Sequence, residues 1–234
     1  MKNILFTLAL LISFISFGQT ADEYFDSGYD KAEAKDYYGA IADFTKAIEL
    51  DPNKVSAYYN RGISKDDLKD YYGAISDYTR AIELDPNKVN AYYNRGISKG
   101  NLKDYYGAIS DYTRAIELDP NKVNAYVNRG LSKSKLKDYN GAIADYTKAI
   151  EINPNDALGY YNRGISKNGL KDNYGAIADY TKAIEINPNY EDAYTNRGIT
   201  KEKLGDLNGA CVDWKKAAEF GDTNAAEWVA KQCN

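Results

Sequence analysis

The chain has 234 residues, which is long enough for a sizeable core, and length alone suggests one or two domains. Its 34 acidic residues exceed its 30 basic residues only slightly, so composition gives no electrostatic signature of binding to nucleic acid or to an anionic membrane. Histidine is absent, which removes the commonest general base, the Ser-His and Cys-His nucleophile pairs and most catalytic zinc sites. We therefore expect no enzyme activity, no metal and no cofactor.

The chain opens with a short apolar segment. A basic second residue precedes the weakly polar-to-apolar run Ile4–Phe17, and Ser16 and Gly18 offer small residues at the two positions that a signal peptidase reads. The run is shorter than the ~20 residues of a membrane-spanning helix, and no cysteine follows it that could carry a lipid. We expect residues 1–18 to be a cleaved signal peptide, with the mature chain beginning at Gln19. The mature protein is then periplasmic or secreted, in an envelope of the Gram-negative type, without stable membrane insertion.

Five prolines recur at one interval and mark an internal repeat. Each lies 34 residues after the one before it: Pro52, Pro86, Pro120, Pro154 and Pro188. A period of this size indicates a solenoid. Alignment on the period gives six repeats, numbered one to six from here on: residues 21–54, 55–88, 89–122, 123–156, 157–190 and 191–224. No linker rich in Ser, Gly or Pro interrupts the array, so residues 19–234 are expected to form one continuous domain.

Each repeat carries two helical patterns. In repeat two the first helix is expected from about Ser56 to Leu68 and the second from about Tyr71 to Leu84. Asp70 is well placed to cap the second helix, and the helix should end before Pro86, because proline has no N–H and disfavours helix at the residue before it. Neither helix has enough apolar surface to be stable alone, so neighbouring repeats must stack.

The spacing of six residues in this repeat resembles that of the tetratricopeptide repeat family. The six are Tyr58, Gly62, Ala74, Tyr78, Ala81 and Pro86. In that family the repeat is a 34-residue helix-turn-helix. The resemblance implies that Gly62 and Ala74 lie where the two helices approach closely, and that Ala81 faces the next repeat. It also implies an all-α fold: a right-handed superhelical α-solenoid of six tandem repeats plus a C-terminal capping helix.

The two ends of the array depart from the repeat pattern, as terminal repeats should. In repeat one Ser27 stands where the other repeats have arginine. Repeat six has no proline, and its Gly221 suits the C-cap of a helix. Residues 225–233 are expected to form a short capping helix, with Val229 and Trp228 covering the end of the stack.

The two cysteines, Cys211 and Cys233, both lie near the C-terminus. In an exported protein such a pair can oxidise, whereas the alternative is two small buried apolar residues. Exported bacterial proteins of the resembled family have similar C-termini, which suggests that Cys211, on the second helix of repeat six, faces Cys233 on the cap. A disulfide there would close a loop of about two dozen residues and contribute ~3 kcal/mol.

The segment YYNRGISK of residues 58–65 recurs, with small changes, in repeats two to six. At about 100° per residue, Tyr59, Asn60 and Ile63 fall on one side of the helix and the packing residues on the other. We therefore expect the first set to line the concave wall of the superhelix. Repeats two and three differ at three positions, of which two fall on this wall and the third, Asp66 against Gly100, sits beside it.

An asparagine ladder follows the concave wall. In several tetratricopeptide repeat proteins asparagines at the matching position hydrogen-bond the backbone of a bound extended peptide, which suits an amide that both donates and accepts. The expected peptide-binding residues are Asn60, Asn94, Asn128, Asn162, Asn196, Tyr59, Tyr93, Tyr161, Ile63, Ile97, Leu131 and Ile165. The alternative is that the asparagines bridge adjacent repeats and the apolar residues pack on one another.

Five arginines stand where the resembled family usually has an apolar residue. An unpaired buried charge is costly, and an antiparallel helix pair would bring an aspartate alongside each arginine. The expected structural ion pairs are Arg61–Asp77, Arg95–Asp111, Arg129–Asp145, Arg163–Asp179 and Arg197–Asp213. Asp43 of repeat one has no such arginine, so it must be solvated or paired otherwise. Asp66 and Asp67 are expected to be solvated rather than to form a metal or catalytic pair.

These observations predict a non-enzymatic scaffold that binds an unidentified protein or peptide segment in a concave groove. The alternative is a self-assembling solenoid or a subunit of an envelope complex. No nucleic-acid partner is expected, and the isolated protein is expected to be monomeric.

Overall fold

The computed structural model describes residues 19–233, so the expected signal peptide at residues 1–18 lies outside the described part. The described residues form thirteen α-helices and no β-strand. The helices are α1 (Ala21–Glu33), α2 (Tyr37–Leu50), α3 (Val55–Asp67), α4 (Tyr71–Leu84), α5 (Val89–Asn101), α6 (Tyr105–Leu118), α7 (Val123–Lys135), α8 (Tyr139–Ile152), α9 (Ala157–Gly169), α10 (Asn173–Ile186), α11 (Glu191–Lys203), α12 (Leu207–Phe220) and α13 (Thr223–Gln232). The prediction of an all-α solenoid of helix-turn-helix repeats with a terminal cap is confirmed.

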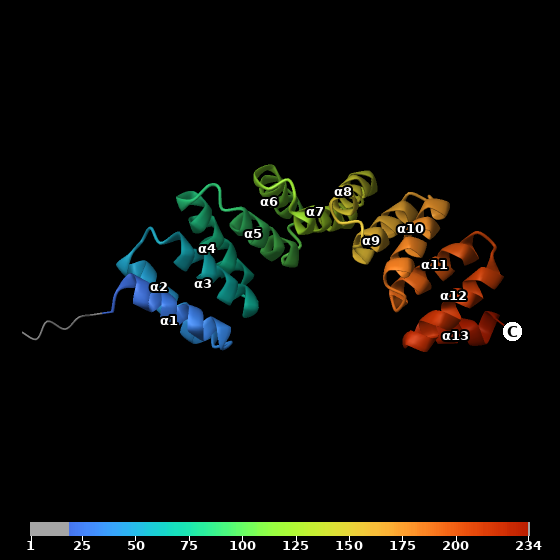
Figure 1. Ribbon diagram of the computed structural model, residues 1–234, viewed down its shortest axis with the longest axis horizontal. Coiled ribbons are helices and arrows are strands. Elements are labelled where there is room, and N and C mark those ends of the chain that lie inside the picture. Colours follow the sequence, from blue (N-terminus) through green and yellow to red (C-terminus); the bar gives the residue numbers. More distant parts are fainter. Residues whose placement is uncertain (1–18, 234) are drawn as a thin grey trace, which may run out of the picture.

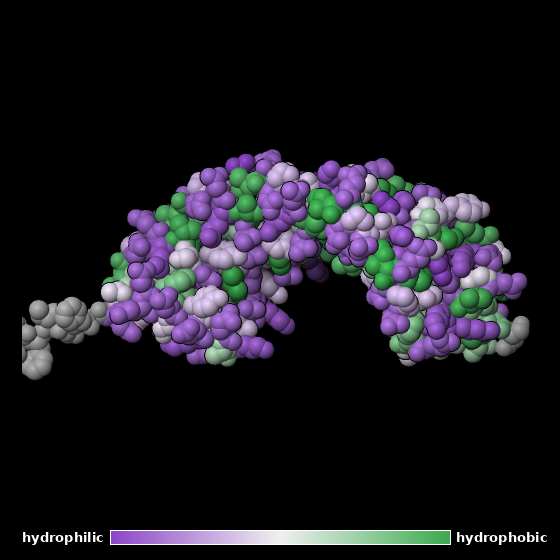
Figure 2. Space-filling model, viewed as in Figure 1, coloured by the Kyte–Doolittle hydropathy of each residue, from purple (hydrophilic) through white to green (hydrophobic). Residues whose placement is uncertain are grey.

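The helices follow one another along an arch (Figure 1). Each helix packs on the helix before it and the helix after it, and each odd-numbered helix from α1 to α9 also touches the next odd-numbered one. Because the first helices of successive repeats approach each other more closely than the second helices do, the array curves with the first helices on the inside. The space-filling view shows the resulting hollow beneath the arch (Figure 2).

The core is a row of close contacts repeated along the array. In repeat two Ala74, Tyr78 and Ala81 are almost completely buried. A β-carbon added at Gly62 would lie 2.6 Å from the ring of Tyr78, so only glycine allows the two helices to approach this closely. The side chains of α3 and α4 thus pack as the repeat spacing predicts.

The second helix of each repeat begins with an aspartate as its N-cap. The carboxylate of Asp70 accepts a hydrogen bond from the N–H of Gly73 at 3.0 Å. An aspartate caps the second helix of each of the other five repeats in the same way. The N-cap satisfies a backbone donor that the helix itself leaves unpaired. The second helix of repeat two has the bounds expected from the sequence, while the first begins and ends one residue earlier.

The turn between the two helices of a repeat holds a residue in the left-handed conformation. At Lys103, φ is 63°, and the N–H groups of Lys103 and Asp104 donate to the carbonyls of Gly100 and Lys99, both at 2.9 Å. This is the Schellman arrangement, in which glycine is the usual residue. Lysine takes this place in repeats one to five, and Gly205 takes it in repeat six.

Replacing Lys103 by glycine is expected to stabilise the protein by about 0.5–1 kcal/mol. A residue with a β-carbon costs about 1–2 kcal/mol in the left-handed conformation, and glycine avoids this cost. Part of the gain is offset because glycine has more conformational entropy in the unfolded chain. Urea denaturation measures the change. Lys103→Ala is the matched control, because it removes the same charge but keeps the β-carbon. Equal stability of the two variants would contradict the interpretation.

The cap helix α13 closes the C-terminal end of the array. It begins two residues before the expected start, after Gly221 has turned the chain with a φ of 114°. The ring of Trp228 lies 5.2 Å from that of Trp214, and Val229 packs against the same buried cluster. A disulfide joins α12 to the end of the cap: Cys211 is bonded to Cys233, with 5.6 Å between their Cα atoms.

Candidate functional site

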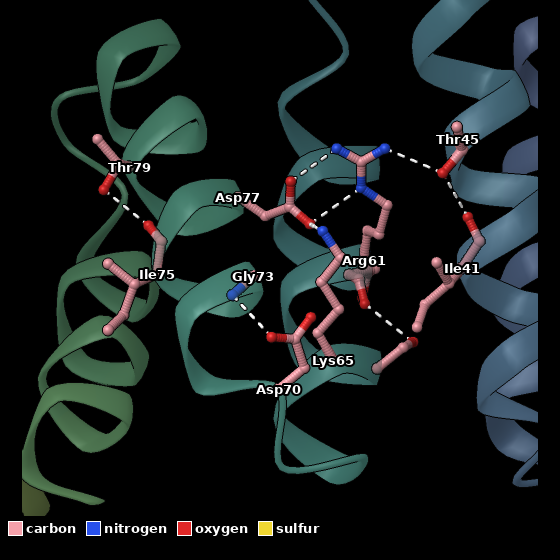
Figure 3. Close-up of polar contacts among 11 residues, drawn as sticks. Ile41, Thr45, Arg61, Lys65, Asp70, Gly73, Ile75, Asp77 and Thr79 are labelled. Atoms are coloured by element: carbon pink, nitrogen blue, oxygen red, sulfur yellow. Dashed lines mark hydrogen bonds and ion pairs between the residues drawn. The ribbon is translucent and has the colours of Figure 1, made fainter. Parts of the chain in front are cut away.

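An ion-pair cluster joins the two helices of each repeat and links the repeat to the one before it. In repeat two, Arg61 donates to both carboxylate oxygens of Asp77, at 2.9 and 2.7 Å, and Lys65 lies 2.7 Å from the same carboxylate (Figure 3). The remaining arm of Arg61 donates to the hydroxyl of Thr45 in repeat one at 2.9 Å. Asp77 is buried, so the cluster holds the array together and takes no part in the groove.

The same cluster recurs in repeats three to six. Its arginine and aspartate pairs are Arg95–Asp111, Arg129–Asp145, Arg163–Asp179 and Arg197–Asp213. The lysines were not expected from the sequence, although each lies four residues after its arginine and thus on the same helix face. In repeat one Asp43 contacts Lys31 at 2.5 Å and accepts from Ser27 at 2.6 Å, so it is paired in another way.

The asparagine ladder bridges adjacent repeats. The amide of Asn94 donates to the hydroxyl of Tyr59 in the preceding repeat at 3.1 Å. The bonds from Asn128 to Tyr93 and from Asn196 to Tyr161 are equivalent, at 3.0 and 2.9 Å. These contacts match the alternative that the asparagines bridge adjacent repeats. Each of the three amides still has its oxygen and one N–H available for another partner.

Two members of the ladder differ from the rest. For Asn60 the corresponding residue of the preceding repeat is Phe25, which has no hydroxyl, so the amide donates instead to the carbonyl of Ser56 in its own helix at 2.9 Å. Asn162 would need a tyrosine at residue 127, where the chain has Val127, and its side chain makes no hydrogen bond with any described residue. Asn162 is therefore the ladder amide left free to contact a ligand.

The three tyrosines expected in the groove lie between repeats instead. Tyr59 contacts the ring of Tyr78 at 5.9 Å, the ammonium of Lys88 lies 5.1 Å from its ring, and burial raises the pKa of its hydroxyl. Tyr93 and Tyr161 pack against their own second helices in the same way. These three tyrosines are thus partly covered but keep some exposed surface, and their expected role in peptide binding stays a prediction.

Cavities open on the concave side where neighbouring first helices meet. The cavity at the junction of repeats one and two has a volume of about 270 Å³, that of three and four about 270 Å³ and that of four and five about 350 Å³. Each is lined by a ladder asparagine and by the apolar residue three positions after it. These pairs are Asn60 with Ile63, Asn128 with Leu131, and Asn162 with Ile165. Ile97 lies on the opposite wall of the second cavity.

The junction of repeats two and three is filled by the chain itself. The carboxylate of Asp66 accepts hydrogen bonds from the hydroxyls of Tyr78, at 2.8 Å, and Ser98, at 2.8 and 3.0 Å. Asp66 is thus half-buried and not solvated as expected, because the next repeat brings Ser98 against it. At the junction of repeats five and six, Asn168 fills the same place and bonds the hydroxyls of Tyr180 and Thr200.

Replacing Asp66 by asparagine is expected to raise the melting temperature by about 1–2 °C at pH 7 and to have little effect near pH 3. Burial, and to a lesser degree Asp67 and Asp70, raises the pKa of Asp66, so the charged carboxylate weakens the folded state once the pH rises through that pKa. The gain of the variant should therefore grow with pH. Asp67→Asn is the control, since it removes the same charge from an exposed side chain. Identical pH profiles for the two variants would refute the argument.

The part of the chain that the structure describes holds no cluster of side chains suited to a metal ion. None of its helices is long and apolar enough to cross a membrane.

Two family models match the chain. The model described as Tetratricopeptide repeat matches residues 55–88, 89–122 and 123–156, and the model described as TPR repeat matches residues 22–64 and 170–205. The matched segments together cover most of the array.

Solved structures share the architecture. The MamA protein is 28% identical with a TM-score of 0.69, and the match covers 71% of this chain and 91% of MamA. YrrB, described as a TPR protein with an unusual peptide-binding site, is 24% identical with a TM-score of 0.69, over 80% of this chain and 97% of YrrB. PilF of Pseudomonas aeruginosa is 17% identical with a TM-score of 0.72, over 90% of this chain and 97% of its own. No curated protein matches the chain.

Proposed function

Because the chain belongs to the tetratricopeptide repeat family and is therefore a protein-interaction scaffold, we propose that it binds an extended segment of another protein in its concave groove, without chemistry of its own. The observation that carries the proposal is the row of cavities between successive first helices. Leu131 and Ile165 line these cavities and are 43% and 36% exposed. Exposed apolar side chains that gather in a groove usually mark a site where another molecule binds.

Differences among the repeats support the same reading. The packing residues and the ion-pair clusters hardly change along the array, whereas the residues on or beside the cavities do. Asp66, Gly100 and Ser134, for example, occupy one position in successive repeats. A fixed scaffold with a variable inner wall is the arrangement that a binding surface requires. The free amide of Asn162 adds a donor and an acceptor for the backbone of an extended segment.

The direct test selects binding peptides from a displayed random library on the folded chain of residues 19–233. Leu131→Arg and Asn162→Ala should each weaken the selected peptides at least fivefold, because one blocks the groove and the other removes its free amide. Leu50→Arg is the matched control: it makes the same replacement at an exposed residue of a second helix. Peptides that bind all variants equally would place binding outside the groove.

We also propose that the protein is exported and that its mature form begins at Gln19. The apolar run Ile4–Phe17 and a disulfide between Cys211 and Cys233, a bond that oxidising compartments favour, support this. Mass spectrometry of the protein from its source would detect the loss of residues 1–18. Recovery of the full-length chain from the cytoplasm would contradict the proposal.

We propose a monomer in isolation. The cap helix α13 buries Ala225 against the last repeat and is bonded to it, which leaves no open repeat surface at that end for a second copy to continue. Size-exclusion chromatography with light scattering tests this, and a constitutive oligomer would favour self-assembly.

A further inference from the structure

Two junctions of the inner wall are filled by side chains of the protein itself, Asp66 and Asn168. At the junction of repeats two and three, the hydroxyls of Tyr78 and Ser98 donate to the carboxylate of Asp66. Equivalent hydroxyl pairs occur at three further junctions. They are Tyr112 with Ser132, Tyr146 with Ser166 and Tyr180 with Thr200. Two hydroxyls that converge on one point can donate to a carboxylate, as they do at Asp66, or accept from the amide of a carboxamide, as they do at Asn168.

At the junction of repeats three and four the partner of the hydroxyl pair is absent. Gly100 stands where repeat two has Asp66, and the hydroxyl of Tyr112 has no hydrogen-bond partner within residues 19–233. Ser132 is 5% exposed, while Ser98 at the filled junction is 0% exposed. The space that the side chain of Asp66 takes up in the previous repeat is here part of a cavity of about 270 Å³.

The next junction is open in a similar way. Ser134 takes the position of Asp66 but is too short to fill the cavity, and among the described residues it bonds neither Tyr146 nor Ser166. The free amide of Asn162 lines the same cavity. Both open junctions therefore present unused polar groups beside apolar walls.

The charges along the inner wall single out these two cavities. Lys135 is the charged residue lining the cavity of repeats three and four, and Lys135 and Lys137 line that of repeats four and five. Neither lysine is in an ion pair in the described part of the chain. The cavity of repeats one and two is lined instead by Glu33 and Asp67, and its second helix has Phe44 in place of the tyrosine. An anionic ligand thus fits repeats three to five and is repelled from repeats one and two.

We propose that this part of the groove binds an extended acidic peptide segment through two side-chain carboxylates, one in each open cavity. In the first cavity the ligand carboxylate takes the place that Asp66 occupies at the filled junction, with Lys135 as counter-charge. Tyr112 donates directly, and Ser132 donates once its hydroxyl turns from the carbonyl of Asn128, which it contacts at 2.9 Å. In the second cavity the ligand carboxylate meets Ser134, Asn162 and the two lysines. The inference rests on the proposed function, since it names the class of segment that the groove takes.

The separation of the cavities sets the spacing of the two acidic residues. Neighbouring packed helices lie about 8–10 Å apart, and an extended segment of the polyproline II type advances about 3.1 Å per residue with about three residues per turn, so residues three positions apart face the same side. Carboxylates in the two cavities therefore belong to residues about three positions apart. Leu131 lies on both cavities, so it contacts the residues between the two acidic ones.

The test measures fluorescence anisotropy of synthetic ten-residue peptides, capped at both ends, with Glu at positions four and seven. The protein should bind this peptide at least tenfold more tightly than the Gln/Gln peptide at low salt, with the difference shrinking as salt increases. A Gln/Gln peptide with a free C-terminal carboxylate should not regain the affinity. Equal affinities of the capped Glu/Glu and Gln/Gln peptides, or no binding of the Glu/Glu peptide at millimolar concentration, would overturn the proposal.

Gly100→Asp gives the sharpest variant, because it recreates the filled junction. A β-carbon at Gly100 would lie 3.9 Å from the Tyr112 hydroxyl, so the new side chain fits. The variant should keep its helical fold, which circular dichroism checks, and lose at least tenfold in affinity for the Glu/Glu peptide. Gly100→Ala, which adds no carboxylate, should bind within about threefold of the original protein. Unchanged binding by Gly100→Asp would overturn the proposal.

Failure of this inference differs from failure of the proposed function. If neutral peptides selected on the folded chain bind and are weakened by Leu131→Arg, while the Glu/Glu peptide gains nothing, the groove binds segments but not acidic ones. If the selected peptides all ignore Leu131→Arg, the groove itself is not the binding site.

Discussion

Replacing Asp145 by alanine is expected to lower the free energy of unfolding by about 3 kcal/mol and the melting temperature by about 6–12 °C. The carboxylate of Asp145 binds Arg129 at 2.6 Å and Lys133 at 2.8 Å, and the side chains of these two cations are only 15% and 20% exposed. Without the carboxylate, the charges of Arg129 and Lys133 are still largely removed from water, and no opposite charge offsets their desolvation energy. Thermal unfolding followed by circular dichroism measures the loss.

A matched control, Glu151, lies less than two turns further along the same helix. Glu151 forms an exposed ion pair with Lys148, at 2.8 Å, so Glu151→Ala removes one negative charge without leaving a buried cation and should change stability little. Arg129→Ala should cost less than Asp145→Ala, because Lys133 still pairs with the carboxylate. If Asp145→Ala melted at the same temperature as Glu151→Ala, the ion-pair cluster would not contribute to the stability of the fold.

Removal of the disulfide is expected to destabilise the C-terminal end of the array by about 3 kcal/mol in the loop-entropy description, for a bond that spans 22 residues. In a repeat array each unit contacts only its neighbours, so the loss should appear as local opening of α13 rather than as unfolding of the whole arch. Both tryptophans of the chain, Trp214 and Trp228, lie at this contact. Tryptophan fluorescence therefore reports the C-terminal end of the array, where the cap packs on the second helix of repeat six.

The measurement compares the oxidised protein with the Cys211→Ser/Cys233→Ser variant. The variant should shift to longer emission wavelengths at a lower temperature than the rest of the helices melt. A reducing agent should produce the same shift in the original protein and none in the variant. Coincident melting of fluorescence and helix signal in both proteins would contradict local opening.

Residues that act within one repeat could be predicted from the sequence. Pro86 and Asp70 mark the boundaries of helices because their effects are local, and the pairing of Arg61 with Asp77 follows from the antiparallel arrangement of two helices joined by a short turn. Helical periodicity also assigns Ile63 to the concave side, where it lines a cavity.

Polar contacts between repeats could be predicted only in part. Helical periodicity gives the direction of a side chain from its own helix, but not what the next repeat places in front of it. Tyr59 points to the inner side, but its hydroxyl accepts a hydrogen bond from Asn94 of the next repeat, and Asp66 meets a serine 32 residues further along the chain. The one available signal was the exchange of Asp66 for Gly100 between two otherwise nearly identical repeats.

The links between repeats join residues at fixed separations, which makes the array extensible. Arg95 bonds Thr79 across 16 residues, and Asn94 bonds Tyr59 across 35. A second copy of residues 89–122, inserted after Lys122, would supply both kinds of bond on each of its sides and would leave the two terminal repeats untouched. Duplication of whole repeats can therefore lengthen the groove without redesigning any interface, and each copy of repeat three would carry its own Gly100 and add one more open cavity to the row.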